Sequence, residues 1–151
     1  MKRCTEQDHK MLMERLINLS EEYSFIRLSY IGTSVMGRPI PIVVLGDEDA
    51  KRGVLYVSTH HATENICTSV MLDFIEDYAS SLQEGKFVYG INLRVLHKMR
   101  KIHIVPMLNP DGVEYHLHGV EKEHILYDRL IKMNGHDEDF SSWQANGRGI
   151  D

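Results

Sequence analysis

The fold is decided by a stretch that runs from an apolar segment into a polar loop: Gly53-Val54-Leu55-Tyr56-Val57-Ser58-Thr59-His60-His61-Ala62-Thr63-Glu64. The first six residues form a short, nearly all-apolar run, which is typical of a β-strand covered on both faces. The remainder places two imidazoles and a carboxylate just before a long helical pattern. In open α/β sheets ligands bind outside the carboxyl ends of the strands, so position alone marks this loop as a candidate site.

Helices and strands alternate around this stretch. Helices are expected at residues 6–19, 64–82 and 91–99, with a further half-exposed helix in the segment 120–139. Strands are expected at residues 25–31, 40–45, 53–58 and 102–106. Cys67 falls on the apolar stripe of the long helix and is expected in the core. The alternation predicts an α/β domain with a mixed, largely parallel sheet flanked by helices.

Composition limits the function classes. The chain has 151 residues, of which 42% are hydrophobic and 26% charged, and a net charge of −5. These values suit one globular domain, and no block of Lys or Arg predicts binding to nucleic acid or to an anionic membrane. No run approaches the ~18 apolar residues of a membrane span. Two cysteines, Cys4 and Cys67, cannot make a disulfide framework, so a cytoplasmic location is expected.

The residue types at His61 and Glu64 suit a metal. At this spacing, one turn of backbone can aim an imidazole nitrogen and a carboxylate oxygen at a common point, ~2 Å from each. A structural explanation stands beside this one, because a Glu in the first turn of a helix also complements the helix dipole. A loop His, likewise, commonly bonds only to a neighbour. His60 should point away from His61 and lie outside any shared coordination sphere.

Four landmarks in order extend the pattern. They are Gly32-x-Ser34-x-x-Gly37-Arg38-Pro39-Ile40, then His61-x-x-Glu64, then Pro106-Met107-Leu108-Asn109-Pro110-Asp111-Gly112, and then Trp143-Gln144-Ala145-Asn146-Gly147-Arg148-Gly149-Ile150-Asp151. Together they resemble the zinc carboxypeptidase family over about residues 31–151. The closest resemblance is to the bacterial branch that cleaves γ-D-glutamyl-diaminopimelate bonds in peptidoglycan peptides. The Asn-Pro-Asp-Gly segment is expected to be a turn that fixes the loop under the site.

The resemblance implies roles for four residues. His61 and Glu64 match the first two ligands of a single zinc ion. Asp151 matches the carboxylate that accepts a hydrogen bond from the histidine ligand and would fix its tautomer. Arg148 lies near the place where relatives carry a guanidinium beside the scissile carbonyl or the substrate carboxylate, a role suited to its permanent charge and planar fork.

The resemblance also implies what this chain lacks. The third zinc ligand, a His, and the general-base Glu lie further along in the family, so residues 1–151 are expected to be the N-terminal portion of one catalytic domain. The zinc site is then incomplete and the fragment inactive by itself. Uncovered sheet surface should favour self-association. The expected parent activity is zinc-dependent hydrolysis of short, peptidoglycan-derived peptides. Two alternatives stay open: an amidohydrolase or deacylase of the same fold, and a non-catalytic peptide-binding pseudoenzyme.

Overall fold

The computed structural model describes residues 5–151, so Cys4 lies outside the described residues. Its helical elements are α1 (His9–Glu22), the short 3-10 helix η1 (Ala62–Glu64), α2 (Ile66–Glu84), α3 (Leu93–Met99), α4 (Pro110–His118) and α5 (Tyr127–Met133). Its strands are β1 (Arg27–Thr33), β2 (Pro39–Leu45), β3 (Arg52–Val57), β4 (Phe87–Val88), β5 (Ile91–Asn92) and β6 (Arg100–Val105). The main sheet of the described region has the strand order β1-β2-β6-β3, and β4 and β5 form a separate hairpin.

The sheet is mixed, as predicted, but it is not largely parallel. β1 pairs with β2 and β2 with β6 in antiparallel fashion, and β3 and β6 form the parallel pair. The hairpin between β1 and β2 explains the difference, because only antiparallel neighbours can be joined by so short a turn. In that turn Ser34 N donates to the Arg38 carbonyl at 2.8 Å. A connection that contains α2 and α3 leads from β3 to its parallel neighbour β6.

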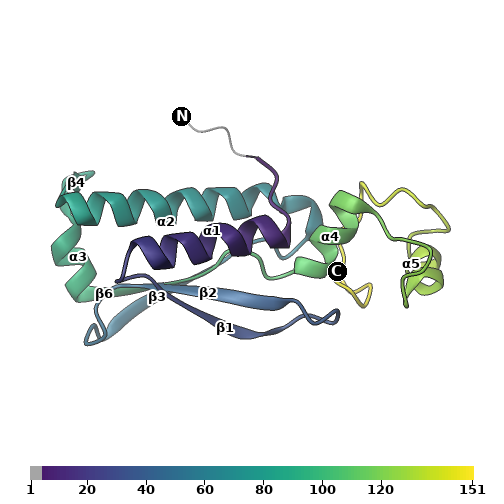
Figure 1. Cartoon of the computed structure of the whole chain (residues 1–151), viewed down its shortest axis with the longest axis horizontal. Coiled ribbons are helices and arrows are strands. Elements are labelled where there is room, and N and C mark those ends of the chain that lie inside the picture. Colours follow the sequence, from purple (N-terminus) through teal and green to yellow (C-terminus); the bar gives the residue numbers. More distant parts are fainter. Residues whose placement is uncertain (1–4) are drawn as a thin grey trace.

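Helices α1 and α2 lie on one face of the sheet and enclose the main core (Figure 1). The expected apolar positions Leu12, Leu16 and Leu19 of α1 are all buried, which confirms the first helix. They pack with sheet residues such as Val43 and Ile104, both fully buried. Asp8 is the N-cap of α1: its side chain accepts from Met11 N at 2.7 Å and so satisfies a free helical N–H.

Two burial predictions are wrong for the described structure. β3 was expected to be covered on both faces, but it pairs with β6 alone and Leu55 is 59% exposed. Cys67 was expected in the core, but it is exposed. The reason is that α2 carries apolar residues around most of its circumference. The sheet buries the side with Leu72 and Ile75, which leaves the side with Cys67 and Phe74 in solvent.

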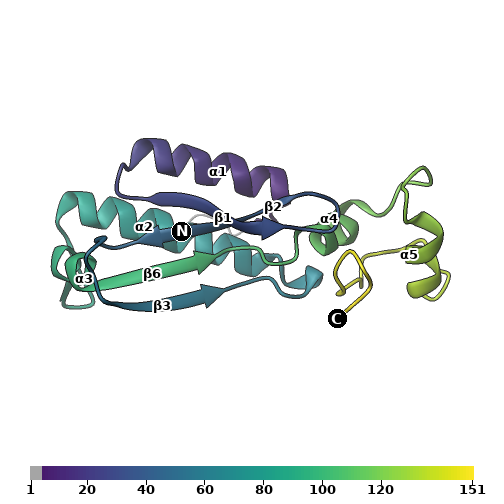
Figure 2. The same cartoon turned by 90° about the horizontal axis from the view of Figure 1, so that it is seen from below.

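The carboxyl ends of β3 and β6 point toward α4, α5 and the C-terminal segment (Figure 2). The segment expected as a turn at residues 109–112 instead opens α4, with Asn109 as its N-cap and Pro110 in its first turn. A second apolar cluster holds this end together, formed by Ala62, Tyr115, Leu130, Phe140 and Trp143. No helix in the described part of the chain combines the length and apolar character needed to cross a bilayer.

Candidate active site

The loops that follow β3 and β6 run side by side at this edge of the sheet. Ser58 N donates to the Val105 carbonyl, Leu108 N to the Ser58 carbonyl and Asn109 N to the Thr59 carbonyl, at 2.9, 3.0 and 3.1 Å. Thr59 has a φ of +53°, which is rare for a β-branched residue and costs ~1–3 kcal/mol. Its hydroxyl contacts the Thr68 hydroxyl at 2.8 Å. This buried turn aims the chain from the strand into the loop that carries His61.

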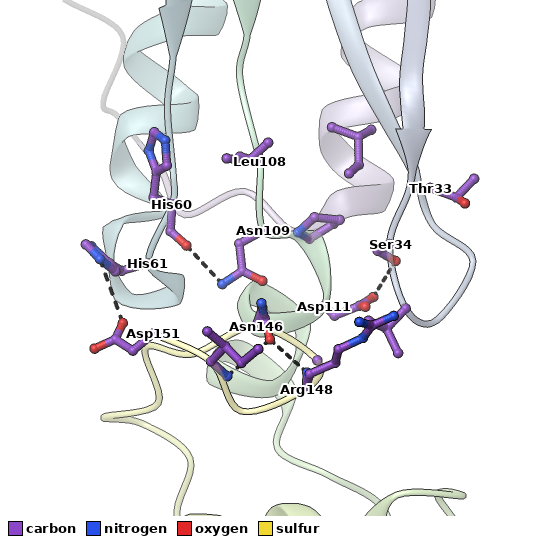
Figure 3. Close-up of a pocket in the computed structure, with 15 residues that line it drawn as sticks. Thr33, Ser34, His60, His61, Leu108, Asn109, Asp111, Asn146, Arg148 and Asp151 are labelled. Atoms are coloured by element: carbon purple, nitrogen blue, oxygen red, sulfur yellow. Dashed lines mark hydrogen bonds and ion pairs between the residues drawn. The ribbon is translucent and has the colours of Figure 1, made fainter.

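His61 and Glu64 converge. The His61 Nδ1 atom lies 3.0 Å from Glu64 Oε1, and the two side chains are 44% and 48% exposed. On the other side of the ring, Nε2 lies 3.7 Å from Asp151 Oδ1. A dashed line marks this ion pair in Figure 3. That distance is an ion-pair distance and is longer than a good hydrogen bond. The imidazole therefore lies between two carboxylates, one from Glu64 at the end of η1 and one from Asp151 in the C-terminal segment.

The electrostatics of the pair follow from this contact. The hydrogen bond to Glu64 raises the pKa of His61, with the charges of Glu64 and Asp151 acting in the same direction. The same bond to His61 lowers the pKa of Glu64. The contact with Glu64 thus stabilises the protonated form of His61, and a metal that binds Nδ1 competes with that proton.

The geometry fits part of a zinc site. Two ligand atoms ~2.0–2.1 Å from a tetrahedral zinc ion lie about 3.3 Å apart, close to the observed separation of Nδ1 and Oε1. A His Nδ1 ligand with a carboxylate beyond its Nε2 is the usual way in which a ligating imidazole is oriented. Within residues 5–151, however, no group of three His, Cys, Asp or Glu residues could hold a metal ion. The described residues therefore bring together two candidate metal ligands, His61 and Glu64, and place the carboxylate of Asp151 beside the His61 ring.

A cavity of about 510 Å³ lies beside the pair, and His60, His61, Arg148 and Asp151 all line it. It is bounded on the far side by the β1–β2 turn and by Asn109 and Asp111 (Figure 3). Arg148 is exposed, and its place is set by its backbone, since Arg148 N donates to Asn146 Oδ1 at 2.8 Å. The structure thus brings His61, Glu64 and Asp151 into contact and places Arg148 at the same cavity without a side-chain contact to them.

Three residues that belong to the sequence landmarks, but to which no individual role was assigned, shape this cavity. Asn146 Oδ1 accepts from Arg148 N and Ile150 N, which folds the loop that carries Arg148 and Asp151. The Asp111 carboxylate is 2% exposed and accepts a hydrogen bond from Ser34 in the β1–β2 turn. The Asn109 amide donates to carbonyls of the His61 loop and of the C-terminal segment. Asn and Asp in turns commonly bond to nearby backbone, but the sequence cannot say which backbone, because the partners lie far away along the chain.

A mixed sheet with a cavity at the carboxyl ends of β3 and β6 is an architecture that α/β enzymes use. Residues 12–151 match the family described as zinc carboxypeptidase. The chain belongs to the zinc carboxypeptidase family.

Similarity to individual proteins is consistent with this family. The chain is 32% identical over 144 residues to a gamma-D-glutamyl-L-diamino acid endopeptidase 1 of Lysinibacillus sphaericus, which covers 95% of this chain and 36% of that protein. It is 33% identical over 144 residues to the uncharacterized protein YqgT of Bacillus subtilis (strain 168), covering 95% of this chain and 38% of that protein. Among solved structures, thrombin activatable fibrinolysis inhibitor superposes with a TM-score of 0.65 at 17% identity over 80% of this chain and 32% of that one, a likeness of fold alone. The chain therefore spans little more than a third of the length of these curated relatives.

Proposed function

We propose that this chain supplies the first half of the active site of a zinc-dependent peptidase, with His61 and Glu64 as two of the metal ligands. The observation that carries the proposal is the 3.0 Å approach of His61 Nδ1 to Glu64 Oε1 beside the cavity that His61 lines. Residues 1–151 are then the N-terminal portion of a single metallocarboxypeptidase-like catalytic domain. Membership of the zinc carboxypeptidase family supports both statements.

Each residue has a distinct role in this proposal. A bound zinc ion would supply Lewis-acid polarisation of the scissile carbonyl. His61 and Glu64 hold the ion, and the negative charge of Asp151, 3.7 Å from Nε2, favours the tautomer of His61 that carries its proton there and leaves the Nδ1 lone pair for the metal. Arg148 projects from the neighbouring loop into the same cavity, where its guanidinium stabilises negative charge on the substrate.

The substrates we propose are short peptides derived from peptidoglycan. The support is the relative whose name is gamma-D-glutamyl-L-diamino acid endopeptidase 1, which matches 95% of this chain. Such peptides carry several carboxylates, which suits a cavity with an exposed Arg at its wall. A cytoplasmic location stays a prediction; the exposed free thiol of Cys67 supports it.

The 151-residue chain by itself is proposed to be inactive. Two ligands leave a zinc ion mainly hydrated, and the described residues offer no third ligand beside them. The exposed apolar residues of β3 and α2, among them Leu55 and Phe74, are proposed to mediate self-association of the isolated chain.

The test uses the whole protein that carries this chain, purified with zinc. We expect it to hydrolyse peptides with a γ-D-glutamyl-diaminopimelate bond faster than peptides with ordinary hydrophobic C-terminal residues, and chelation to stop both reactions. His61→Ala should abolish turnover. His60→Ala is the matched control, because it removes a neighbouring exposed imidazole at the same cavity, and it should leave most of the turnover. Equal turnover by wild type and His61→Ala would refute the proposed ligand.

A further inference from the structure

The His61 loop and the C-terminal segment meet through one buried side chain. Asn109 is 6% exposed and lies at the end of the connection from β6, between the two segments. Its Nδ2 atom lies 3.1 Å from the carbonyl oxygen of His60, the residue just before His61. The same Nδ2 lies 3.3 and 3.2 Å from the carbonyl oxygens of Gln144 and Ala145, in the segment that continues to Arg148 and Asp151. Figure 3 shows the amide of Asn109 directed at the His60 carbonyl.

The contact continues in the backbone. Ala62 N donates to the Gln144 carbonyl at 3.0 Å, so the loop after His61 bonds directly to the segment that Asn109 also holds. Gly112 makes the approach possible, because a Cβ there would collide with the Ala145 carbonyl oxygen and with the Asn109 amide. The other end of the Asn109 side chain is fixed as well, since Oδ1 accepts from Gly112 N at 3.0 Å.

From these contacts we infer that Asn109 is a positioning residue for the candidate metal site: its amide holds the segment with His61 and Glu64 in register with the segment with Arg148 and Asp151. The inference rests on the proposed function for its link to zinc. The first segment contains only the single turn of η1, and the second contains no helix or strand. Regular strand pairing therefore does not fix the two segments to each other. An amide is suited to this position because it offers two donors to the carbonyls and one acceptor to the helix cap at the same time.

The two functions of Asn109 can be separated by substitution. Asn109→Asp keeps an oxygen that caps α4 at Gly112 N but replaces the donors with a carboxylate oxygen that faces three carbonyls. Asn109→Ser also keeps a capping oxygen, without the charge, and is too short to reach the carbonyls. Asn92→Asp is the matched control, because Asn92 caps α3 in the same way by accepting from Arg94 N and Val95 N, away from the cavity.

Amide hydrogen exchange by NMR on the 151-residue chain tests the inference without any metal. Leaving buried carbonyls unpaired shifts a local opening equilibrium by about 5- to 150-fold. We therefore expect exchange of the Ala62 amide to accelerate by that factor in Asn109→Asp and Asn109→Ser. Amides of the paired strands β2 and β6 should stay unchanged, and Asn92→Asp should match wild type throughout. Unchanged exchange at Ala62 would overturn the inference. A parallel acceleration in β2 and β6 would do the same, because it would make Asn109 a general stabiliser of the fold.

A second measurement tests the link to the metal and uses the whole protein that carries this chain. Zinc titration of that protein, followed by the NMR signals of His61, should give an affinity about 10- to 100-fold weaker in Asn109→Ser than in wild type, the range for a lost supporting partner. Equal affinity in the two proteins, with Ala62 exchange accelerated, would overturn the positioning role. Absence of any zinc effect at His61 in wild type would instead contradict the proposed function, and the exchange of Ala62 would still decide whether Asn109 joins the two segments.

Discussion

Asp111 should be the most costly single charge to remove from the region beside the candidate site. Its carboxylate is 2% exposed and accepts three bonds from the β1–β2 turn: Ser34 Oγ at 2.7 Å, Arg38 Nη1 at 2.7 Å and Met36 N at 3.0 Å. Gly147 packs directly against it, because a Cβ there would lie 2.8 Å from Asp111 Oδ2. The residue thus joins the turn on one side of the cavity to the loop that carries Arg148 on the other.

The magnitude follows from these bonds. A hydrogen bond to a charged group contributes ~1.5–3 kcal/mol, and removing one partner of a buried pair costs ~3–5 kcal/mol. Arg38 keeps 29% of its side chain in solvent, so the lower end of that range applies to its pairing. We expect Asp111→Ala to lose about 3 kcal/mol of unfolding free energy and Asp111→Asn about 2 kcal/mol, since the amide retains two acceptor contacts but opposes Met36 N–H. For a chain of this size 3 kcal/mol lowers Tm by roughly 6–12 °C.

Urea unfolding followed by circular dichroism measures this loss, with the exposed Asp49→Asn as the control that changes charge equally. Asp49→Asn should stay within ~0.5 kcal/mol of wild type. A double-mutant cycle with Arg38→Ala should give a coupling of about 1–3 kcal/mol. If Asp111→Asn is as stable as Asp49→Asn, the buried carboxylate is not what holds the turn, and the reasoning from its three contacts is refuted.

Three further predictions concern other parts of the chain. Burial lowers the pKa of His97, so as pH falls through ~6.5 the unfolded chain takes up a proton on this residue before the folded chain does, and the fold loses stability. The unfolding free energy, measured with urea, should therefore fall less steeply from pH 7 to pH 5 in His97→Gln than in wild type. Equal slopes in the two proteins would contradict this. Leu55→Lys and Phe74→Lys, each at an exposed apolar position, should shift the isolated chain toward monomer in sedimentation velocity, whereas Glu121→Lys in the exposed insert should not; identical distributions for all variants would exclude this surface. The isolated chain should show no stoichiometric tight zinc binding in calorimetry and no peptidase activity, and chelator-sensitive turnover by it would mean that the described residues form a complete site.

Local patterns were sufficient for most of the fold. Leu12, Leu16 and Leu19 of α1 were predicted from helical spacing and are buried, because a single apolar stripe has only one way to face a core. The rule failed for α2, where apolar residues such as Val70 and Phe74 lie outside the single core-facing side. It failed again for β3, because an apolar strand looks the same in sequence whether its second face is covered or open. Strand direction was also beyond local patterns, since the β2–β6 pairing joins segments far apart in the chain.

The candidate site, like the fold, was predictable where its contacts are local in the sequence and not where they are distant. His61 and Glu64 are three residues apart, and the structure brings them into contact. Asp151 and Arg148 were placed near them by the family resemblance, and the structure puts both at the same cavity. The amide of Asn109 and the carboxylate of Asp111 were visible only as a turn motif. Their partners, His60 and Ser34 among them, lie 49 and 77 residues away in the chain, so spacing carries no signal for them.

His61 and Glu64 are proposed to bind the same metal ion. Anomalous diffraction at the zinc absorption edge, on crystals of this protein soaked in zinc, locates that ion. We expect a peak ~2.0–2.2 Å from both His61 Nδ1 and Glu64 Oε1, with Asp151 beside Nε2. A peak held by other side chains, with the loop from His60 to Glu64 ordered and His61 and Glu64 pointing apart, would contradict it.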